Sequence, residues 1–215
     1  GEASVPILKK LFLFHLLMGT YYCFFIQGDA IGYWGAPKLY EFSTFKENLF
    51  KHKVIGNCCT AALISDKGSI DWLYFPNFDS PSIFASLLDR EKGGYFGFEV
   101  SPDYQISQSY VPHTNILSTN FVSEENEFAV VDFMPCYHLS DASNCYRPAE
   151  IYRYIRRIKG TPRFKINYEP APDYARGKTI FNTTSEYIET YSTSNSKDRQ
   201  YLYSSLPLHN ILEQK

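Results

Sequence analysis

Two acidic residues are the first candidates for chemistry in this chain of 215 residues, Asp71 and Asp79. Asp79 is the last residue of the segment at residues 76–79. Two carboxyl groups held close together can act as general acid and general base in a hydrolytic reaction. Asp71, however, precedes Trp72 in an apolar run, which favours a structural role in which its carboxylate binds backbone groups. Asp79 precedes Ser80, where it would help to cap a helix. We therefore predict that neither acid is catalytic.

No other catalytic or ligand-binding arrangement is evident in the sequence. No Gly-x-Ser-x-Gly turn of a serine hydrolase accompanies the scattered histidines, which are His15, His52, His113, His138 and His209. Gly93 and Gly94 are typical of a turn rather than of a phosphate-binding loop. The adjacent Cys58 and Cys59 are too close for an ordinary disulfide or a shared tetrahedral metal site. The sequence predicts no catalytic residue, no metal site and no cofactor.

The remaining cysteines bear on the cellular compartment. Cys136 and Cys145 could pair, but we interpret them as free thiols. Free thiols favour a reducing compartment. A cytoplasmic location is therefore favoured, with export as the alternative if residues 9–26 act as a signal segment.

Residues 1–50 form an unassigned N-terminal segment. Lys9 and Lys10 precede an apolar run at residues 11–26, which is short for a membrane-spanning helix. His15 weakens the interpretation as a signal peptide, and no small-residue cleavage site follows. Three interpretations stay open: an export signal, an amphipathic packing segment, or sequence foreign to the domain. A membrane is not expected as a partner.

Composition favours strands over helices. The chain is 44% hydrophobic and 17% aromatic, with 18 Tyr, 17 Phe and only 2 Met. So many aromatic residues indicate a β-sandwich core, with a sugar-stacking surface as the alternative. The formal net charge of −2 gives no electrostatic reason to expect nucleic acid as a partner. We interpret the cationic run at residues 153–159 as a solvated strand.

The elements around Asp71 and Asp79 can be assigned from local patterns. Strands are predicted at residues 61–64 and 70–75, joined by a tight turn at residues 65–68 that ends in glycine. A helix is predicted to begin at Ser80 and to stop at Gly93, because Phe84, Leu87 and Leu88 recur at helical spacing.

The rest of the chain is predicted to be almost entirely β. Residues 127–133 are apolar on both faces, which is typical of a strand inside a sandwich. Further strands are predicted at residues 95–100, 115–122, 152–158, 163–169, 179–182, 186–191 and 200–204. The fold class is all-β: a large antiparallel super-sandwich with one short helix, preceded by the unassigned apolar segment.

One long motif points to a family. Residues 55–85 read I-G-N-C-C-T-A-A-L-I-S-D-K-G-S-I-D-W-L-Y-F-P-N-F-D-S-P-S-I-F-A. This run closely resembles the start of the N-terminal domain of glycoside hydrolase family 15, the glucoamylase and trehalase-like enzymes. The resemblance continues at residues 131–135, 147–156 and 168–175, and it covers about residues 53 to 205.

The resemblance implies a many-stranded super-sandwich that precedes an (α/α)6 catalytic barrel. We expect residues 51–215 to form this domain and to end before the barrel. Both catalytic glutamates of the family lie in the barrel, so the chain alone is expected not to hydrolyse sugars. Its expected partners are that barrel and an α-glucoside substrate, which could be a starch-like glucan, a shorter α-glucoside or trehalose. The alternative is a stand-alone carbohydrate-binding module.

The loop at residues 76–79 is the candidate substrate contact implied by the resemblance. Asn77, Phe78 and Asp79 would reach toward the barrel and touch the sugar. The chain departs from the family in this loop, because Asn77 stands where the family has an arginine. Cys59 also stands at a position where the family usually has an arginine. Asn77 can offer hydrogen bonds but no charge-assisted fork to the sugar.

Overall fold

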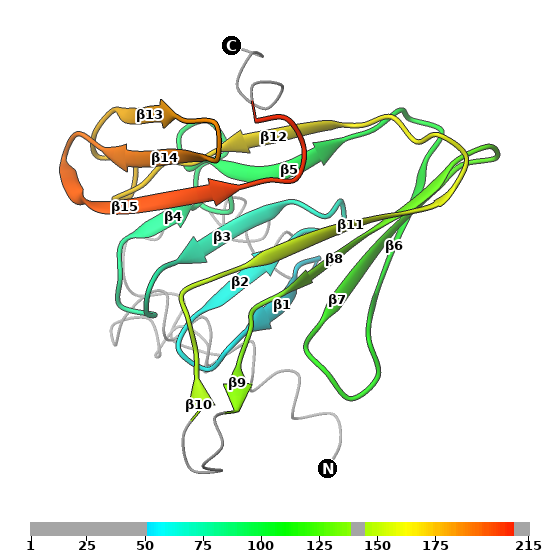
Figure 1. Cartoon of the computed structure of the whole chain (residues 1–215), viewed down its shortest axis with the longest axis horizontal. Coiled ribbons are helices and arrows are strands. Elements are labelled where there is room, and N and C mark those ends of the chain that lie inside the picture. Colours follow the sequence, from blue (N-terminus) through cyan, green and yellow to red (C-terminus); the bar gives the residue numbers. More distant parts are fainter. Residues whose placement is uncertain (1–50, 139–144, 209–215) are drawn as a thin grey trace, which may run out of the picture. The chain divides into compact units, whose positions relative to one another are not determined.

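The computed structural model describes residues 51–138 and 145–208 (Figure 1). Within these ranges the regular elements are fifteen β-strands, and no helix occurs. The strands are β1 Lys53–Gly56, β2 Ala61–Ile64, β3 Ile70–Tyr74, β4 Ser82–Phe84, β5 Tyr95–Glu99, β6 Gln105–Tyr110, β7 Leu117–Val122, β8 Glu127–Phe133, β9 Tyr137–His138, β10 Cys145–Tyr146, β11 Tyr152–Lys159, β12 Lys165–Glu169, β13 Thr179–Thr183, β14 Tyr187–Ser192 and β15 Asn195–Tyr203. The all-β, antiparallel prediction is confirmed. Strands β1, β4, β6, β9 and β10 were not predicted.

The first layer is a six-stranded sheet with the order β1-β2-β3-β5-β12, in which β4 pairs with β3. The predicted hairpin lies at its centre. Gly68 donates its backbone N–H to the carbonyl of Ser65 at 2.9 Å, and it has a φ of 77°, which glycine adopts without steric cost. Local turn chemistry therefore sets the β2–β3 connection.

The predicted helix at Ser80 is wrong, because residues 82–84 form strand β4 instead. In β4, Ser82 pairs with Tyr74 and Phe84 pairs with Leu73 of β3. All three β4 residues are buried, whereas a helix would bury only the stripe facing the core. Only one helical turn follows, closed by hydrogen bonds from Leu88 and Asp89 to the carbonyl of Ala85. Pairing with β3 overrides the local helical spacing.

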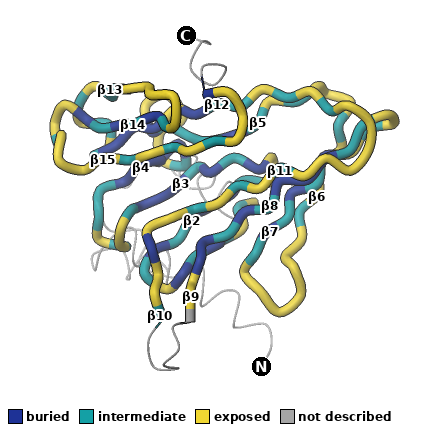
Figure 2. Tube along the Cα trace, in the orientation of Figure 1, coloured by how far each residue is buried: buried dark blue, intermediate teal, exposed yellow. Residues whose placement is uncertain are grey.

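The second layer consists of a four-stranded sheet, in the order β11-β8-β7-β6, and a three-stranded sheet, in the order β13-β14-β15. Both pack on the six-stranded sheet. Ile188 of β14 and Leu117 of β7 share one buried cluster with Ile70 and Leu73 of β3. Figure 2 shows the buried residues concentrated along the strands between the layers.

A second cluster fills the space between β8 and the far end of the first layer. Phe121 and Phe128 stack with ring centroids 4.5 Å apart, and Phe164 stacks on Phe128 at 4.7 Å. Phe128, Ala129 and Val130 of β8 are fully buried. The predicted strand at residues 127–133 is confirmed, and Phe128, Val130 and Asp132 are buried on its inward face, whereas Val131 and Phe133 on the other face are only partly buried.

Arg153 of β11 lies in the interior, so the interpretation of residues 153–159 as a solvated strand is wrong at this position. Its side chain is 5% exposed, and its Nε donates to Oδ1 of Asp132, which is 0% exposed, at 2.8 Å. The guanidinium also donates to the carbonyls of Phe96 and Gly68 in the first layer. Arg153 and the partly buried Ile155 lie on the inward face of β11, while the strand is exposed from Arg156 onward.

Cys136 and Cys145 form a disulfide, so their interpretation as free thiols is wrong. The short β9–β10 hairpin pairs Tyr137 with Tyr146, which brings the two cysteine Cα atoms to 6.4 Å. That separation lies within the range a disulfide spans. The argument for a reducing compartment therefore loses its basis, although Cys58 and Cys59 remain free thiols.

Residues 1–50 lie outside the described residues, and so do the three interpretations of the apolar N-terminal run. The expected domain boundary at residue 51 stays a prediction. Within residues 51–138 and 145–208, no helix is long and apolar enough to cross a membrane.

Replacing Arg153 with methionine should lower the free energy of unfolding by about 3–5 kcal/mol at neutral pH, because Asp132 would remain buried without its cation. Burial already raises the pKa of Asp132 against the opposing effect of Arg153. A folded pKa above the unfolded value means that protonation favours the folded state, so the loss should shrink as the pH falls. Urea unfolding at two pH values measures both effects.

The matched control is Arg156→Met, three residues along the same strand, where the side chain is exposed. This variant should change the free energy of unfolding by less than about 0.5 kcal/mol. Equal losses for the two variants would show that the buried pair does not hold the layers together.

Candidate functional site

The predicted substrate-contact loop lies directly after β3. Asn77 and Asp79 are exposed, and Phe78 is half-buried. The backbone N–H of Phe78 donates to the carbonyl of Cys59 at 3.2 Å. Oγ of Ser80 accepts the backbone N–H of Asn77 at 3.1 Å, so Ser80 closes this loop rather than capping a helix. The expected helix-capping role of Asp79 is wrong, because no helix begins there.

A second turn, at residues 57–60, contacts this loop through the carbonyl of Cys59. Asn57 is buried, and its Oδ1 accepts the backbone N–H groups of Cys59 and Thr60, each at 3.1 Å. Its Nδ2 donates to the carbonyl of Pro148 at 2.9 Å, which ties the turn to the segment before β11. Cys58 has a φ of 72°, a backbone conformation that is uncommon outside glycine. Asn57 is therefore a structural residue that fixes this turn.

The third turn, at residues 173–175, carries unusual backbone strain. Asp173, Tyr174 and Ala175 have φ values of 57°, 55° and 56°. A left-handed conformation costs roughly 1–2 kcal/mol for each such residue, so the surroundings must hold it in place. Oδ2 of Asp173 accepts the Ser194 hydroxyl at 2.6 Å, and Arg176 donates its backbone N–H to the carbonyl of Asp173 at 3.1 Å.

The three turns meet at Tyr74, the last residue of β3. The Thr60 hydroxyl donates to the carbonyl of Tyr74, and the Tyr74 ring contacts the Tyr174 ring at a centroid distance of 6.4 Å. Burial, and then the neighbouring Tyr174, raise the pKa of Tyr74, so its hydroxyl stays protonated at neutral pH. Tyr174 is 46% exposed. We call the residues 57–60, 76–79 and 173–175 the β3-end turns.

The β3-end turns offer hydrogen-bonding groups and an exposed ring. Of their two acids, Asp173 already accepts the Ser194 hydroxyl, whereas Asp79 is exposed. Of the residues predicted to contact substrate, Asn77, Phe78 and Asp79 all belong to this group. Sequence reasoning missed Asn57 and Tyr174. An asparagine at the start of a tight turn was the available signal for Asn57, whereas nothing in the sequence announces three consecutive left-handed residues.

Asp71 lies elsewhere and has a different partner from the one predicted. Its Oδ2 lies 2.9 Å from Nε2 of His52, and both side chains are largely buried. The backbone carbonyl of Asp71, rather than its carboxylate, accepts the N–H of Leu87. The structural role is therefore an interaction between side chains, and the prediction of backbone binding by this carboxylate is wrong.

Comparison with known proteins places the chain in a family. Residues 43–202 match the family described as trehalase-like, N-terminal. The chain belongs to this family. The resemblance to the glycoside hydrolase family 15 N-terminal domain is thereby confirmed.

The similar curated proteins are trehalases. The trehalase-like domain is 35% identical to a trehalase of Thermoplasma volcanium over 132 residues, which cover 60% of this chain and 20% of that protein. It is 50% identical to trehalase 1 of Sulfolobus acidocaldarius over 82 residues, 38% of this chain and 14% of the relative. A trehalase of Mycobacterium tuberculosis is 31% identical over 154 residues, 64% of this chain and 22% of the relative.

The trehalase-like domain thus spans about a fifth of the length of the relatives it matches. The comparisons support the trehalase part of the expectation and give no support to glucoamylase. No solved structure matches the chain.

Replacing Asn57 with alanine should lower the free energy of unfolding by about 2–3 kcal/mol, because two backbone N–H groups and the carbonyl of Pro148 would lose their hydrogen-bond partner. Asn77→Ala in the neighbouring loop is the control and should cost less than about 0.5 kcal/mol, because the Asn77 side chain is exposed. Thermal unfolding followed by circular dichroism compares the two. A stable Asn57→Ala variant would refute the role of Asn57 in fixing the turn.

Proposed function

We propose that this domain is the non-catalytic N-terminal part of a trehalase-type glycoside hydrolase that acts on an α-glucoside. The single observation that carries the proposal is the family match over residues 43–202, joined to relatives that are trehalases about five times as long as the matched segment. In this proposal the family's super-sandwich packs on a catalytic (α/α)6 barrel, and the barrel supplies both carboxyl groups of the reaction.

Three largely buried carboxyl groups among the described residues support a non-catalytic role. A glycosidase acid needs a raised pKa together with access to the glycosidic oxygen. Burial raises the pKa of Asp132, but this carboxyl lies fully inside the core against Arg153. Asp71 is engaged by His52, and Asp173 by Ser194. These acids serve the fold.

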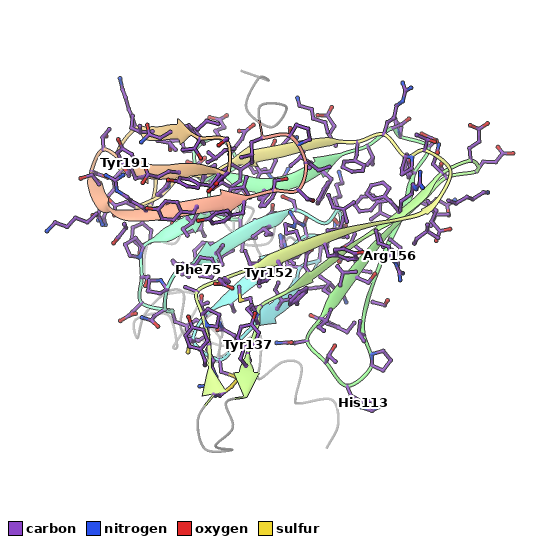
Figure 3. All side chains as sticks on the ribbon, viewed as in Figure 1. Phe75, His113, Tyr137, Tyr152, Arg156 and Tyr191 are labelled. Carbon is purple, nitrogen blue, oxygen red and sulfur yellow. A yellow bond between two sulfur atoms is a disulfide. The ribbon has the colours of Figure 1, made fainter. Side chains whose placement is uncertain are left out.

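The outer face of β11 and β8 supports a role in packing against another domain. Tyr152 and Tyr154 of β11 alternate with buried Arg153, and Tyr154 is 61% exposed. The Tyr152 ring stacks on Phe133 of β8 at a centroid distance of 5.2 Å, and Val131 is the register partner of Tyr154. Figure 3 shows Tyr152 and Arg156 along β11. A contiguous apolar strip of this kind is typical of an interaction surface.

The β3-end turns would complete one wall of the substrate cleft in this arrangement. Asn77 and Asp79 are exposed and offer an amide and a carboxylate to sugar hydroxyls. Phe78 is half-buried, and its backbone bond to Cys59 orients the loop. We propose trehalose as the first substrate to test, because the relatives are trehalases.

The purified chain should release no glucose from trehalose, because in the proposed arrangement both catalytic carboxyl groups belong to the barrel. A coupled glucose assay with maltotriose as a second substrate measures this, and the known trehalase of Thermoplasma volcanium serves as the positive control. Circular dichroism confirms that the tested material is folded. Glucose release by purified material would overturn the assignment of a non-catalytic role.

The chain should self-associate when purified without a catalytic domain, because the outer face of β11 and β8 would be exposed. Replacing Tyr152 and Tyr154 together with lysine should restore a monomer in size-exclusion chromatography. The control variant changes Glu91 to glutamine and Asp103 to asparagine, which adds the same charge at exposed turn positions and should leave association unchanged. We call the outer face of β11 and β8 the docking face. A wild-type chain that is monomeric at every concentration tested would count against a role of this face in protein contacts.

A further inference from the structure

The outward face of the three-stranded sheet has a chemistry that the proposed function does not use. Alternation in β13, β14 and β15 directs one set of side chains inward, where Ile188, Phe181 and Leu202 join the core. The other set faces outward, as the register of the sheet shows. We call the following members of this outward set the tyrosine face: Asn182, Tyr187, Glu189, Tyr191, Arg199, Tyr201 and Tyr203. Figure 3 shows Tyr191 on this sheet.

The aromatic rings of the tyrosine face are held in place by one another. The Tyr187 ring contacts Tyr201 at 5.4 Å and Tyr203 at 5.6 Å, so it supports both neighbours from the middle strand. Tyr201 is 49% exposed and Tyr203 is 67% exposed. Two accessible rings of fixed orientation can accept the apolar face of a ligand with little loss of side-chain entropy.

The polar groups of this face form a network around Glu189. Its Oε2 accepts from Nδ2 of Asn182 at 2.8 Å, while its Oε1 accepts from Arg199 at 2.7 Å and from the Tyr201 hydroxyl at 3.2 Å. The guanidinium of Arg199 also lies over the Tyr191 ring, 4.7 Å from its centroid. The Asn182 amide, and then Arg199, lower the pKa of Glu189, which keeps it a carboxylate. Donors and acceptors therefore stand beside the exposed rings in a fixed arrangement.

The charge of the tyrosine face selects the kind of ligand. Glu189 and Arg199 neutralise each other within the face. A phosphate or an acidic peptide would meet a cation that is already paired, and a basic ligand would meet a paired carboxylate. A purely apolar partner would bury the polar groups of the network without offering them hydrogen bonds, which costs free energy. A neutral molecule with apolar ring faces and many hydroxyl groups matches both features.

We propose that the tyrosine face binds a neutral oligosaccharide, whose sugar rings stack on Tyr201 and Tyr203 while its hydroxyls bond to Asn182, Glu189 and Arg199. This site lies on β13–β15, whereas the docking face lies on β11 and β8. It therefore goes beyond the proposed function and holds or fails independently of it. The site retains a saccharide without cleaving it.

Isothermal titration calorimetry on the full chain tests the proposal with trehalose, maltoheptaose and cellohexaose. A linear glucan that covers both rings should bind with a dissociation constant on the order of 0.1–1 mM, and trehalose more weakly. Replacing Tyr201 or Tyr203 with alanine should weaken binding about three- to tenfold. Tyr201→Phe keeps the ring and loses only one hydroxyl bond, so it should bind nearly as well as the wild type.

The matched control is Tyr146→Ala, which removes a similarly exposed ring from the β9–β10 hairpin, outside both proposed surfaces, and should leave saccharide binding unchanged. Circular dichroism checks that each variant is folded. Absence of heat with all three saccharides at about 20 mM would overturn the proposal, because that concentration far exceeds the expected constant. Binding that survives the alanine changes at Tyr201 and Tyr203, or that disappears in Tyr146→Ala, would overturn it as well.

Discussion

The buried ion pair between Arg153 and Asp132 is the constraint on which the arrangement of the layers depends. An ion pair removed from water is costly unless every polar group of the pair is satisfied. Here the guanidinium binds Asp132 twice and also reaches the carbonyls of Phe96 and Gly68. It further lies 4.8 Å from the ring centroids of both Phe96 and Phe98. One side chain of the second layer thus fixes a strand and a turn of the first.

The position of Arg153 also determines what the domain can present to a partner. Residues in a strand alternate between its faces, so burying Arg153 directs Tyr152 and Tyr154 outward. The same pair that joins the layers therefore creates an aromatic strip on the outside of β11. A slip of one residue in the register would bury the two tyrosines and expose the arginine.

The two outward faces of the second layer differ in chemistry. On β11 and β8, Tyr152 stacks on Phe133, with Val131 and Tyr154 beside them, and this surface suits contact with another folded domain. On β13–β15, the tyrosines surround a hydrogen-bonded carboxylate, and this surface suits a hydroxylated ligand. The β3-end turns add exposed loop residues at a third place. The exposed surfaces of the domain thus differ in chemistry, while the buried Asp132 and Asp71 are engaged within the fold.

The sequence alone determined the family, the all-β class and the β2–β3 hairpin, because each rests on contiguous residues whose local chemistry decides the outcome. The turn ending at Gly68 needs only its own backbone. The tertiary structure alone decided that residues 82–84 pair with β3, that Arg153 is buried, and that Cys136 meets Cys145. It also decided which tyrosines gather around Glu189. In each of these cases the partner lies on another strand or beyond a turn, and a local pattern carries no information about which face of a strand a distant layer will cover.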